Sequence, residues 1–117
     1  MSNDIQRLQT SARMSQVVIA NGVVHLAGQV PDTENASITQ QVTEILARID
    51  ALLASAGTDK TRLLTANIWL SDIRRREELN RVWDAWLASG HAPTRACVQS
   101  FLGTGVDVEI AVTALAR

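Results

Sequence analysis

The chain has 117 residues, of which 46% are hydrophobic, and a formal net charge of −1. This length is close to the commonest size of a folding unit, so we expect one domain over residues 1–117. The near-neutral charge indicates no basic surface for nucleic acid, and no apolar run approaches the ~18 residues of a membrane helix. The single Cys97 excludes an internal disulfide framework. Because the N-terminus lacks the apolar segment of a signal peptide, we expect a cytoplasmic protein.

The N-terminal part of the sequence predicts a β-hairpin. The first dozen residues are polar and predict a short edge strand or an arm. Apolar runs at 14–20 and 23–27 flank Asn21-Gly22. Asn-Gly between two such runs is the strongest short-range hairpin signal, because both turn residues accept a positive φ.

A long amphipathic helix is predicted from about Ser37 to Ala56. Apolar residues recur there at spacings of three and four, which places them on one stripe. Asn35 or Ser37 is available as the N-cap, and Gly57 stands where a C-terminal glycine is favoured.

The second half predicts a strand, a helix and two more strands. Residues 63–70 alternate as a strand, and 73–89 have the stripe of a second helix that Ser71 or Asp72 caps and Gly90 ends. Residues 91–99 and 106–116 predict the last two strands, with Gly103-Thr-Gly105 shaping a hairpin loop between them.

The resulting order, β-β-α-β-α-β-β, predicts the α+β class. Two helices suffice to cover one face of a mixed sheet of five or six strands. The other face would present Trp69, Cys97, Ala111 and Leu115. Because so apolar a face is not left to solvent, we expect the chain to self-associate.

The last two predicted strands each carry a charged residue where a half-buried strand favours none. Alternation places Arg95 with Cys97, and Glu109 with Asp107 and Ala111, off the apolar face. An arginine fork can hold the carboxylate of a small organic acid. A nearby glutamate can orient or deprotonate a water, or protonate a leaving amine. From the residues alone, the alternative is a surface ion pair between neighbouring strands.

Other chemistries find little support in the sequence. His25 and His91 stand far apart and no metal-binding spacing occurs, so no metal site is predicted. No histidine base is positioned near Cys97, and a lone buried cysteine is more often a small packing residue. The run Arg74-Arg-Arg76 is followed at once by Glu77-Glu78, which is typical of a solvated helix surface.

Several short motifs occur in an order and spacing typical of one protein family. These motifs are Ser15-Gln16-Val17, Ala27-Gly28-Gln29-Val30-Pro31, Leu79-Asn80-Arg81-Val82-Trp83-Asp84-Ala85-Trp86, Ala92-Pro93-Thr94-Arg95-Ala96-Cys97-Val98 and Val108-Glu109-Ile110. On these segments the chain resembles, over almost its whole length, the Rid family of reactive-intermediate imine/enamine deaminases, also called YjgF-like or L-PSP endoribonuclease-like proteins. The Trp-Asp-Ala-Trp and Gly-His-Ala-Pro segments look most like a less-studied branch of that family.

The resemblance implies a chorismate-mutase-like α+β fold and a homotrimer whose open sheet faces form a central barrel. It also implies three active sites in clefts between subunits, where deaminating members hydrolyse 2-aminoacrylate and related enamines or imines to 2-keto acids and ammonia without a cofactor. By this resemblance Arg95 grips the substrate carboxylate and Glu109 positions the attacking water. The positions that line or shape the cleft are Asn80, Cys97, Gly28 and Ser15.

Two positions differ from the family pattern. The cleft tyrosine before Ser-Gln is Met14 here, and the serine before Gly-Gln is Ala27. Methionine fills space and donates no proton, so we expect a more apolar acid as substrate. A non-catalytic trimer that binds a small carboxylate is the alternative function. An endoribonuclease is a third, which the net charge of −1 and the sparse aromatic residues disfavour.

Overall fold

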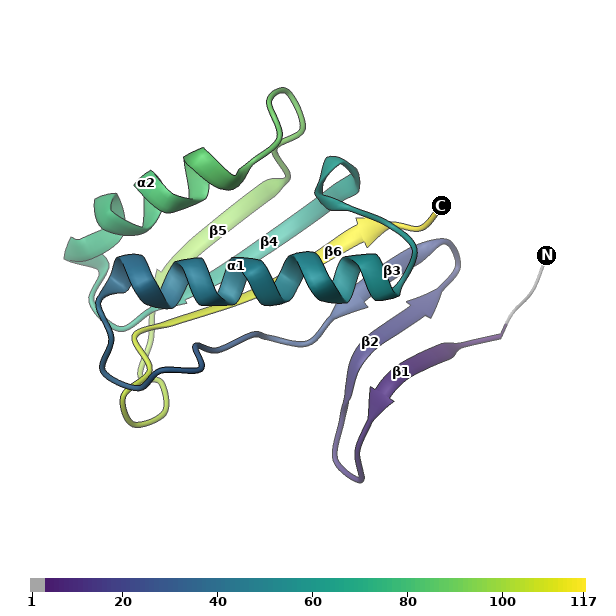
Figure 1. Ribbon diagram of the computed structural model, residues 1–117, viewed down its shortest axis with the longest axis horizontal. Helices are drawn as coiled ribbons and strands as arrows, with labels where there is room; N and C mark the ends of the chain where they lie inside the picture. The colour runs from purple at the N-terminus through teal and green to yellow at the C-terminus, as the bar shows by residue number, and fades with distance from the viewer. Residues whose placement is uncertain (1–3) are drawn as a thin grey trace.

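A mixed six-stranded sheet forms one layer of the protein, and two helices lie together on one of its faces (Figure 1). The computed structural model describes residues 4–117. The strands are β1 (Gln6–Thr10), β2 (Ser15–Ala20), β3 (Val23–Leu26), β4 (Leu63–Leu70), β5 (Thr94–Gln99) and β6 (Val108–Leu115). The helices are α1 (Ile38–Ser55) and α2 (Arg76–Trp86), with short 3₁₀ turns at Lys60–Arg62 (η1) and Ile73–Arg75 (η2). Among residues 4–117, no helix is long and apolar enough to cross a membrane.

The predicted hairpin is confirmed. Strands β2 and β3 pair antiparallel, and Asn21 and Gly22 between them have φ values of 51° and 77°. This is the positive-φ pair that a two-residue hairpin turn requires. Strand β1 pairs antiparallel with β2 at the edge of the sheet, so the polar N-terminal segment forms an edge strand.

The long helix α1 supplies most of the helical half of the core. Ser37 caps it, since its Oγ accepts a hydrogen bond from the Gln40 backbone N–H at 3.1 Å. Gly57 follows its end with a φ of 77°, as predicted. The stripe predicted for this helix is buried in full: Ile38, Val42, Ile45, Ile49, Leu52 and Leu53.

Helix α2 is shorter than the predicted 73–89. Its predicted first turn is the 3₁₀ turn η2, which Asp72 caps by accepting from the Arg74 backbone N–H at 3.0 Å. The helix ends at Trp86 because Leu87 turns to an extended ψ of 141°. The buried side of α2 carries Leu79 and Trp83, whose spacing of four is that of the predicted helical stripe.

The order of the strands corrects one prediction about the site. The order is β1-β2-β3-β6-β4-β5, so β4 lies between β5 and β6 and these two strands are not neighbours. Strand β5 follows α2 and pairs parallel with β4, as expected of a strand–helix–strand crossover. The glycines Gly103 and Gly105 therefore belong to a loop that passes the end of β4, and not to a hairpin.

The two faces of the sheet differ in burial. The helix-covered face presents the buried residues Ala66, Ile68, Leu70, Val108, Ile110, Val112 and Ala114. We call the other face the open face. It carries Trp69, as predicted, paired with Glu109 of β6, and the exposed Leu115, also as predicted. Strict alternation along 63–70 would bury Leu64 with Ala66, but Leu63 is buried and Leu64 is exposed, because the register of β4 and β6 shifts between Leu63 and Thr65.

Candidate functional site

Arg95 stands at the start of β5 and faces α2. In the parallel ladder it lies beside Ala66, which is buried under the helices. Its Nη1 donates to Asn80 Oδ1 at 2.8 Å, and its Cζ lies 5.8 Å from the centre of the Trp83 ring. An amide and an aromatic face thus hold the guanidinium in one orientation. We call Arg95, Asn80, Trp83 and Cys97 the arginine group.

Cys97 does not lie on the open face, which corrects the prediction for it. It pairs with Ile68 in the ladder and packs against the core as a half-buried residue. Because side chains alternate along a strand, Cys97 lies on the same side of β5 as Arg95. The pairing of β5 with β4 directs that side towards the helices. Burial raises the pKa of the Cys97 thiol, and Arg95 and Arg76 lower it only in part. At neutral pH Cys97 is therefore a protonated thiol and not an activated nucleophile.

Glu109 lies on the open face of β6, against a glycine. A Cβ at Gly28 would overlap Glu109 Oε2 and would lie 3.0 Å from its Cδ. Gly28 thus provides the space that the carboxylate occupies, and any larger residue would displace it. The next residue, Gln29, exchanges both backbone hydrogen bonds with Ile110, at 2.8 and 3.1 Å, which fixes this approach. We call Glu109 and Gly28 the glutamate group.

Met14 and Ser15 stand at the turn between β1 and β2. The Met14 side chain is 45% exposed. The Ser15 and Thr10 hydroxyls share a hydrogen bond of 2.8 Å. Because Val17 pairs with Leu26, Ser15 and Gly28 lie at the same end of the β2–β3 hairpin. These two predicted cleft residues therefore belong near the glutamate group, while Asn80 and Cys97 belong to the arginine group.

Within one chain the two groups lie apart. Arg95 lies beside Ala66 and Glu109 beside Trp69, three residues further along β4. At the usual strand dimensions this is about 10 Å along β4 and about 10 Å across it. The two side chains also point to opposite faces of the sheet. The prediction of one pair on neighbouring strands is therefore wrong for the single chain, and a site that uses both residues needs two copies.

Within residues 4–117, neither Arg95 nor Glu109 forms an ion pair. Among the ion pairs of residues 4–117, the arginines involved are Arg48, Arg74, Arg75 and Arg117. Neither Arg95 nor Glu109 is among the paired residues of that part of the chain. The surface ion pair considered as an alternative is therefore not formed within the chain, and both groups are available to a ligand. The described residues contain no cluster of His, Cys, Asp or Glu that would hold a metal.

Two features of the site were not predicted from the sequence. Trp83 is a core residue, 3% exposed, but one face of its ring also lies under Arg95. Gln29 is a buried polar residue, 2% exposed, directly behind Gly28. The sequence marked Gln29 in two ways: it follows an apolar strand, and it belongs to the motif Ala27-Gly28-Gln29-Val30-Pro31.

Comparison with known proteins agrees with this fold and with the motifs. Residues 4–116 match the family described as Endoribonuclease L-PSP. A RutC family protein of Haemophilus ducreyi is 40% identical over 111 residues, which are 94% of this chain and 95% of that protein.

Solved structures give the same result. The crystal structure of NMB1025, a YjgF family member from Neisseria meningitidis, matches with a TM-score of 0.94 and 42% identity over 98% of this chain and 97% of that one. The structure of YyfA of the Rid protein family, from Yersinia pestis, matches with a TM-score of 0.86 and 29% identity over 92% of this chain and 90% of that one. The chain therefore belongs to the Endoribonuclease L-PSP family, whose members are also called YjgF and Rid proteins.

Proposed function

We propose that this protein hydrolyses small enamines or imines that carry a carboxylate, such as 2-aminoacrylate, to 2-keto acids and ammonia. The reaction takes place in a cleft between two copies, with Arg95 from one copy and Glu109 from the other. The observation that carries this proposal is that both side chains are held in place, carry no counter-ion within residues 4–117, and lie on opposite faces of one sheet. Membership of the Rid family supports the reaction class.

In this proposal Arg95 binds the substrate carboxylate. Asn80 and Trp83 already orient the guanidinium, so little side-chain entropy is lost when the two-point contact forms. The Cys97 thiol is neutral and packs beside it, which adds an apolar wall without a competing charge. The walls of the cleft thus favour a small acid over a larger polar one.

In this proposal Glu109 acts as the general base and then the general acid of the hydrolysis. The enamine tautomerises to the imine, and the imine nitrogen takes a proton from solvent. Water adds to the carbon of this protonated imine while the Glu109 carboxylate takes one proton of the water, which gives a carbinolamine. The resulting carboxylic acid gives that proton to the amino group. The C–N bond then breaks, ammonia leaves, and the Glu109 carboxylate takes the hydroxyl proton as the 2-keto acid forms and passes it to solvent. No cofactor takes part in this sequence.

The open face supports assembly into the homotrimer of the proposal, with a central barrel and a chorismate-mutase-like subunit. That face and the loops beside it carry exposed apolar side chains, of which Val98 is 49% and Leu115 42% exposed. Strand β5 is also an unpaired sheet edge, with free backbone groups for a neighbour. Light scattering after size exclusion tests this assembly, and a monomer at micromolar concentration contradicts it.

A coupled assay tests the activity. A serine or threonine dehydratase generates 2-aminoacrylate, and keto-acid formation is followed with and without the protein. The expected result is acceleration by the wild type and its loss in Arg95→Ala and in Glu109→Gln. Arg74→Ala is a matched control, because that side chain is 87% exposed and pairs with Asp72, which belongs to neither group. No acceleration by the wild type, or equal acceleration by Arg95→Ala, contradicts the proposal.

Met14 favours a second candidate, a trimer that binds a small carboxylate without turnover. Its side chain offers no proton donor at a position where the family has a tyrosine. Saturable binding of a 2-keto acid that is lost in Arg95→Ala, with no acceleration in the coupled assay, supports the binder. The variant Met14→Tyr distinguishes the binder from the deaminase. If this variant gains turnover in the coupled assay, the lack of turnover in the wild type is due to the absence of a proton donor at position 14.

A further inference from the structure

A polar pocket of about 250 Å³ opens beside α1, on the part of the fold that carries β1 and β2. Its lining residues are Gln9, Gln16, Gln29, Arg48, Ala51 and Leu52. None of them belongs to the arginine group or the glutamate group. The volume is below the 300 to 1,000 Å³ typical of drug-sized ligands, so only a small molecule fits.

Gln29 presents one oriented acceptor to this pocket. Its Nε2 donates to Gln16 Oε1 at 2.8 Å and to the Ala27 carbonyl at 3.0 Å, which uses both amide hydrogens. A flipped amide would set Oε1 against two acceptors, so this orientation is fixed. Within residues 4–117 Gln29 Oε1 has no hydrogen-bond donor, and no fully enclosed side-chain polar atom lacks a partner. Oε1 is therefore open to the pocket that Gln29 lines.

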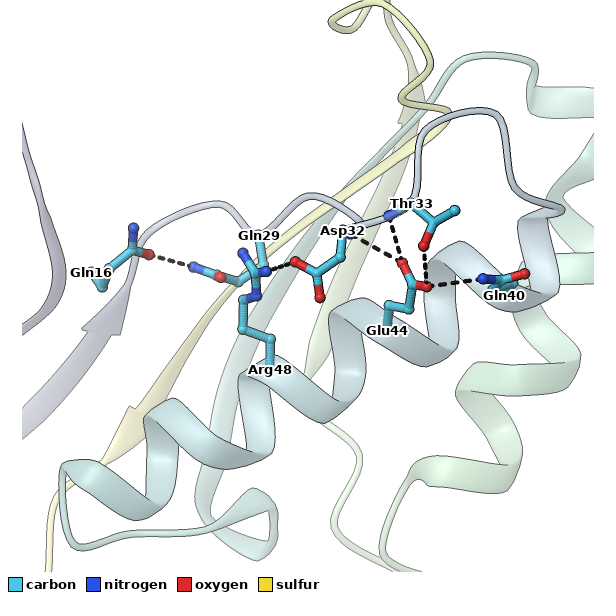
Figure 2. Close-up of polar contacts among 7 residues, drawn as sticks. All are labelled: Gln16, Gln29, Asp32, Thr33, Gln40, Glu44 and Arg48. Carbon is cyan, nitrogen blue, oxygen red and sulfur yellow. Dashed lines mark hydrogen bonds and ion pairs between the residues drawn. The ribbon is translucent and has the colours of Figure 1, made fainter.

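Two donors stand next to this acceptor. Because Gln16 turns its Oε1 to Gln29, its Nε2 is left as a donor on the pocket wall. Arg48 binds Asp32 through Nη2, and its other guanidinium hydrogens have no acceptor among residues 4–117. Figure 2 shows these side chains in a row along α1, with Gln16 joined to Gln29 and Arg48 to Asp32.

The charge of the pocket points to a neutral ligand. Among the described residues that line the pocket, Arg48 alone is charged, and the Asp32 carboxylate neutralises it. The rest of the polar wall is uncharged amide, and Ala51 and Leu52 supply an apolar side. An anion would have to compete with Asp32 for the guanidinium. A group with one N–H donor and one carbonyl acceptor matches the wall without that competition.

We propose that this pocket is a binding site for a small neutral carboxamide. The N–H of the ligand donates to Gln29 Oε1, its carbonyl accepts from Gln16 Nε2 and Arg48, and its carbon chain lies on Ala51 and Leu52. The proposal does not depend on the deaminase activity, because the pocket shares no side chain with the two groups.

Titration of the full-length ¹⁵N-labelled protein with propanamide tests this site, with isosteric propanoate as the charged control. We expect saturable chemical-shift changes at the side-chain amides of Gln16 and Gln29 with propanamide only, and a Kd on the order of millimolar for so small a ligand. Ala51→Leu fills the pocket from an exposed helix position and should weaken binding at least about tenfold, which is ~1.4 kcal/mol. Ala51→Met is a second filler if the first disturbs the fold.

Two further variants sharpen the test. Arg95→Ala should bind propanamide as the wild type does, which separates this site from the proposed catalytic cleft. Asp32→Asn frees the Arg48 guanidinium, so this variant should gain binding of propanoate. The proposal is overturned if propanamide causes no saturable change, if propanoate binds the wild type equally well, or if both filled variants bind propanamide unchanged.

Discussion

Replacing Gly28 by alanine adds one methyl group at the Glu109 carboxylate. The new Cβ would lie 3.0 Å from Glu109 Cδ and 3.3 Å from Cγ, both inside ordinary van der Waals contact, and would overlap Oε2. The carboxylate must therefore move by about 1 Å, a displacement that can cost about 10²-fold in rate. The coupled assay should show this loss in kcat.

The fold should tolerate the same change. The φ of Gly28 is outside the left-handed region, and the atoms in the way are the far end of a flexible side chain. The displaced rotamer of Glu109 should destabilise the folded state by ~0.5–1.5 kcal/mol. Replacing glycine by alanine also lowers the entropy of the unfolded chain, which stabilises the folded state by ~0.4–1 kcal/mol. Urea denaturation should therefore give a free energy of unfolding within about 1 kcal/mol of the wild type.

Gly103→Ala is the matched control, because nothing lies closer than 3.9 Å to a Cβ there. It should keep full activity. If Gly28 acts only through Glu109, then adding Gly28→Ala to Glu109→Gln should cause no further loss. Full activity of Gly28→Ala, or an equal loss in the Gly103→Ala control, would refute the assignment of Gly28 as the residue that positions Glu109.

Three further predictions follow from single contacts. Asn80→Leu removes the 2.8 Å hydrogen bond to Arg95, so we expect KM to rise about tenfold with little change in kcat; a kcat defect alone would contradict this role. The Glu44 carboxylate accepts hydrogen bonds from Gln40 and from Thr33, and these bonds hold its pKa below the ordinary 4.5 (Figure 2). The stabilisation that they give is therefore complete above pH 4.5, and it is lost as the pH falls through the lowered pKa of the folded protein. Glu44→Gln should flatten this acid limb in urea titrations at pH 3 to 7, and an unchanged limb would contradict it. Burial raises the Cys97 pKa, so iodoacetamide at pH 7.5 should label it more slowly in the native than in the urea-unfolded protein, as mass spectrometry would measure; equal rates would contradict a buried thiol.

Local features of the fold followed from local sequence. The Asn21-Gly22 turn needs only two residues that accept positive φ, and the stripe of α1 needs only the helical period. The end of α2 was harder to predict from the sequence. Leu87 continues the apolar spacing of the helix, and only its extended backbone ends the helix. Periods of this kind fix which residues share a face, but not where that face points.

The arrangement of the candidate site required the strand order. Alternation correctly grouped Arg95 with Cys97, but the face they occupy depends on the pairing of β5 with β4, which joins residues about 30 positions apart. The assumption that consecutive strands are neighbours failed at β5 and β6, since the crossover through α2 places β5 outside β4. The pocket beside α1 could not be predicted from local sequence either, because Gln16, Gln29 and Arg48 come from three separate segments: β2, the loop after β3, and α1.

The central claim, that Arg95 and Glu109 of different copies form one active site, can be tested by complementation. Arg95→Ala and Glu109→Gln proteins are each inactive in this account. Unfolded together at equal concentrations and refolded, they assemble at random, and about a quarter of the interfaces combine an intact Arg95 with an intact Glu109. We expect the mixture to recover about a quarter of the wild-type activity, and either protein refolded alone to recover none. A mixture that stays inactive, although mass spectrometry shows mixed oligomers, would contradict a site shared between copies.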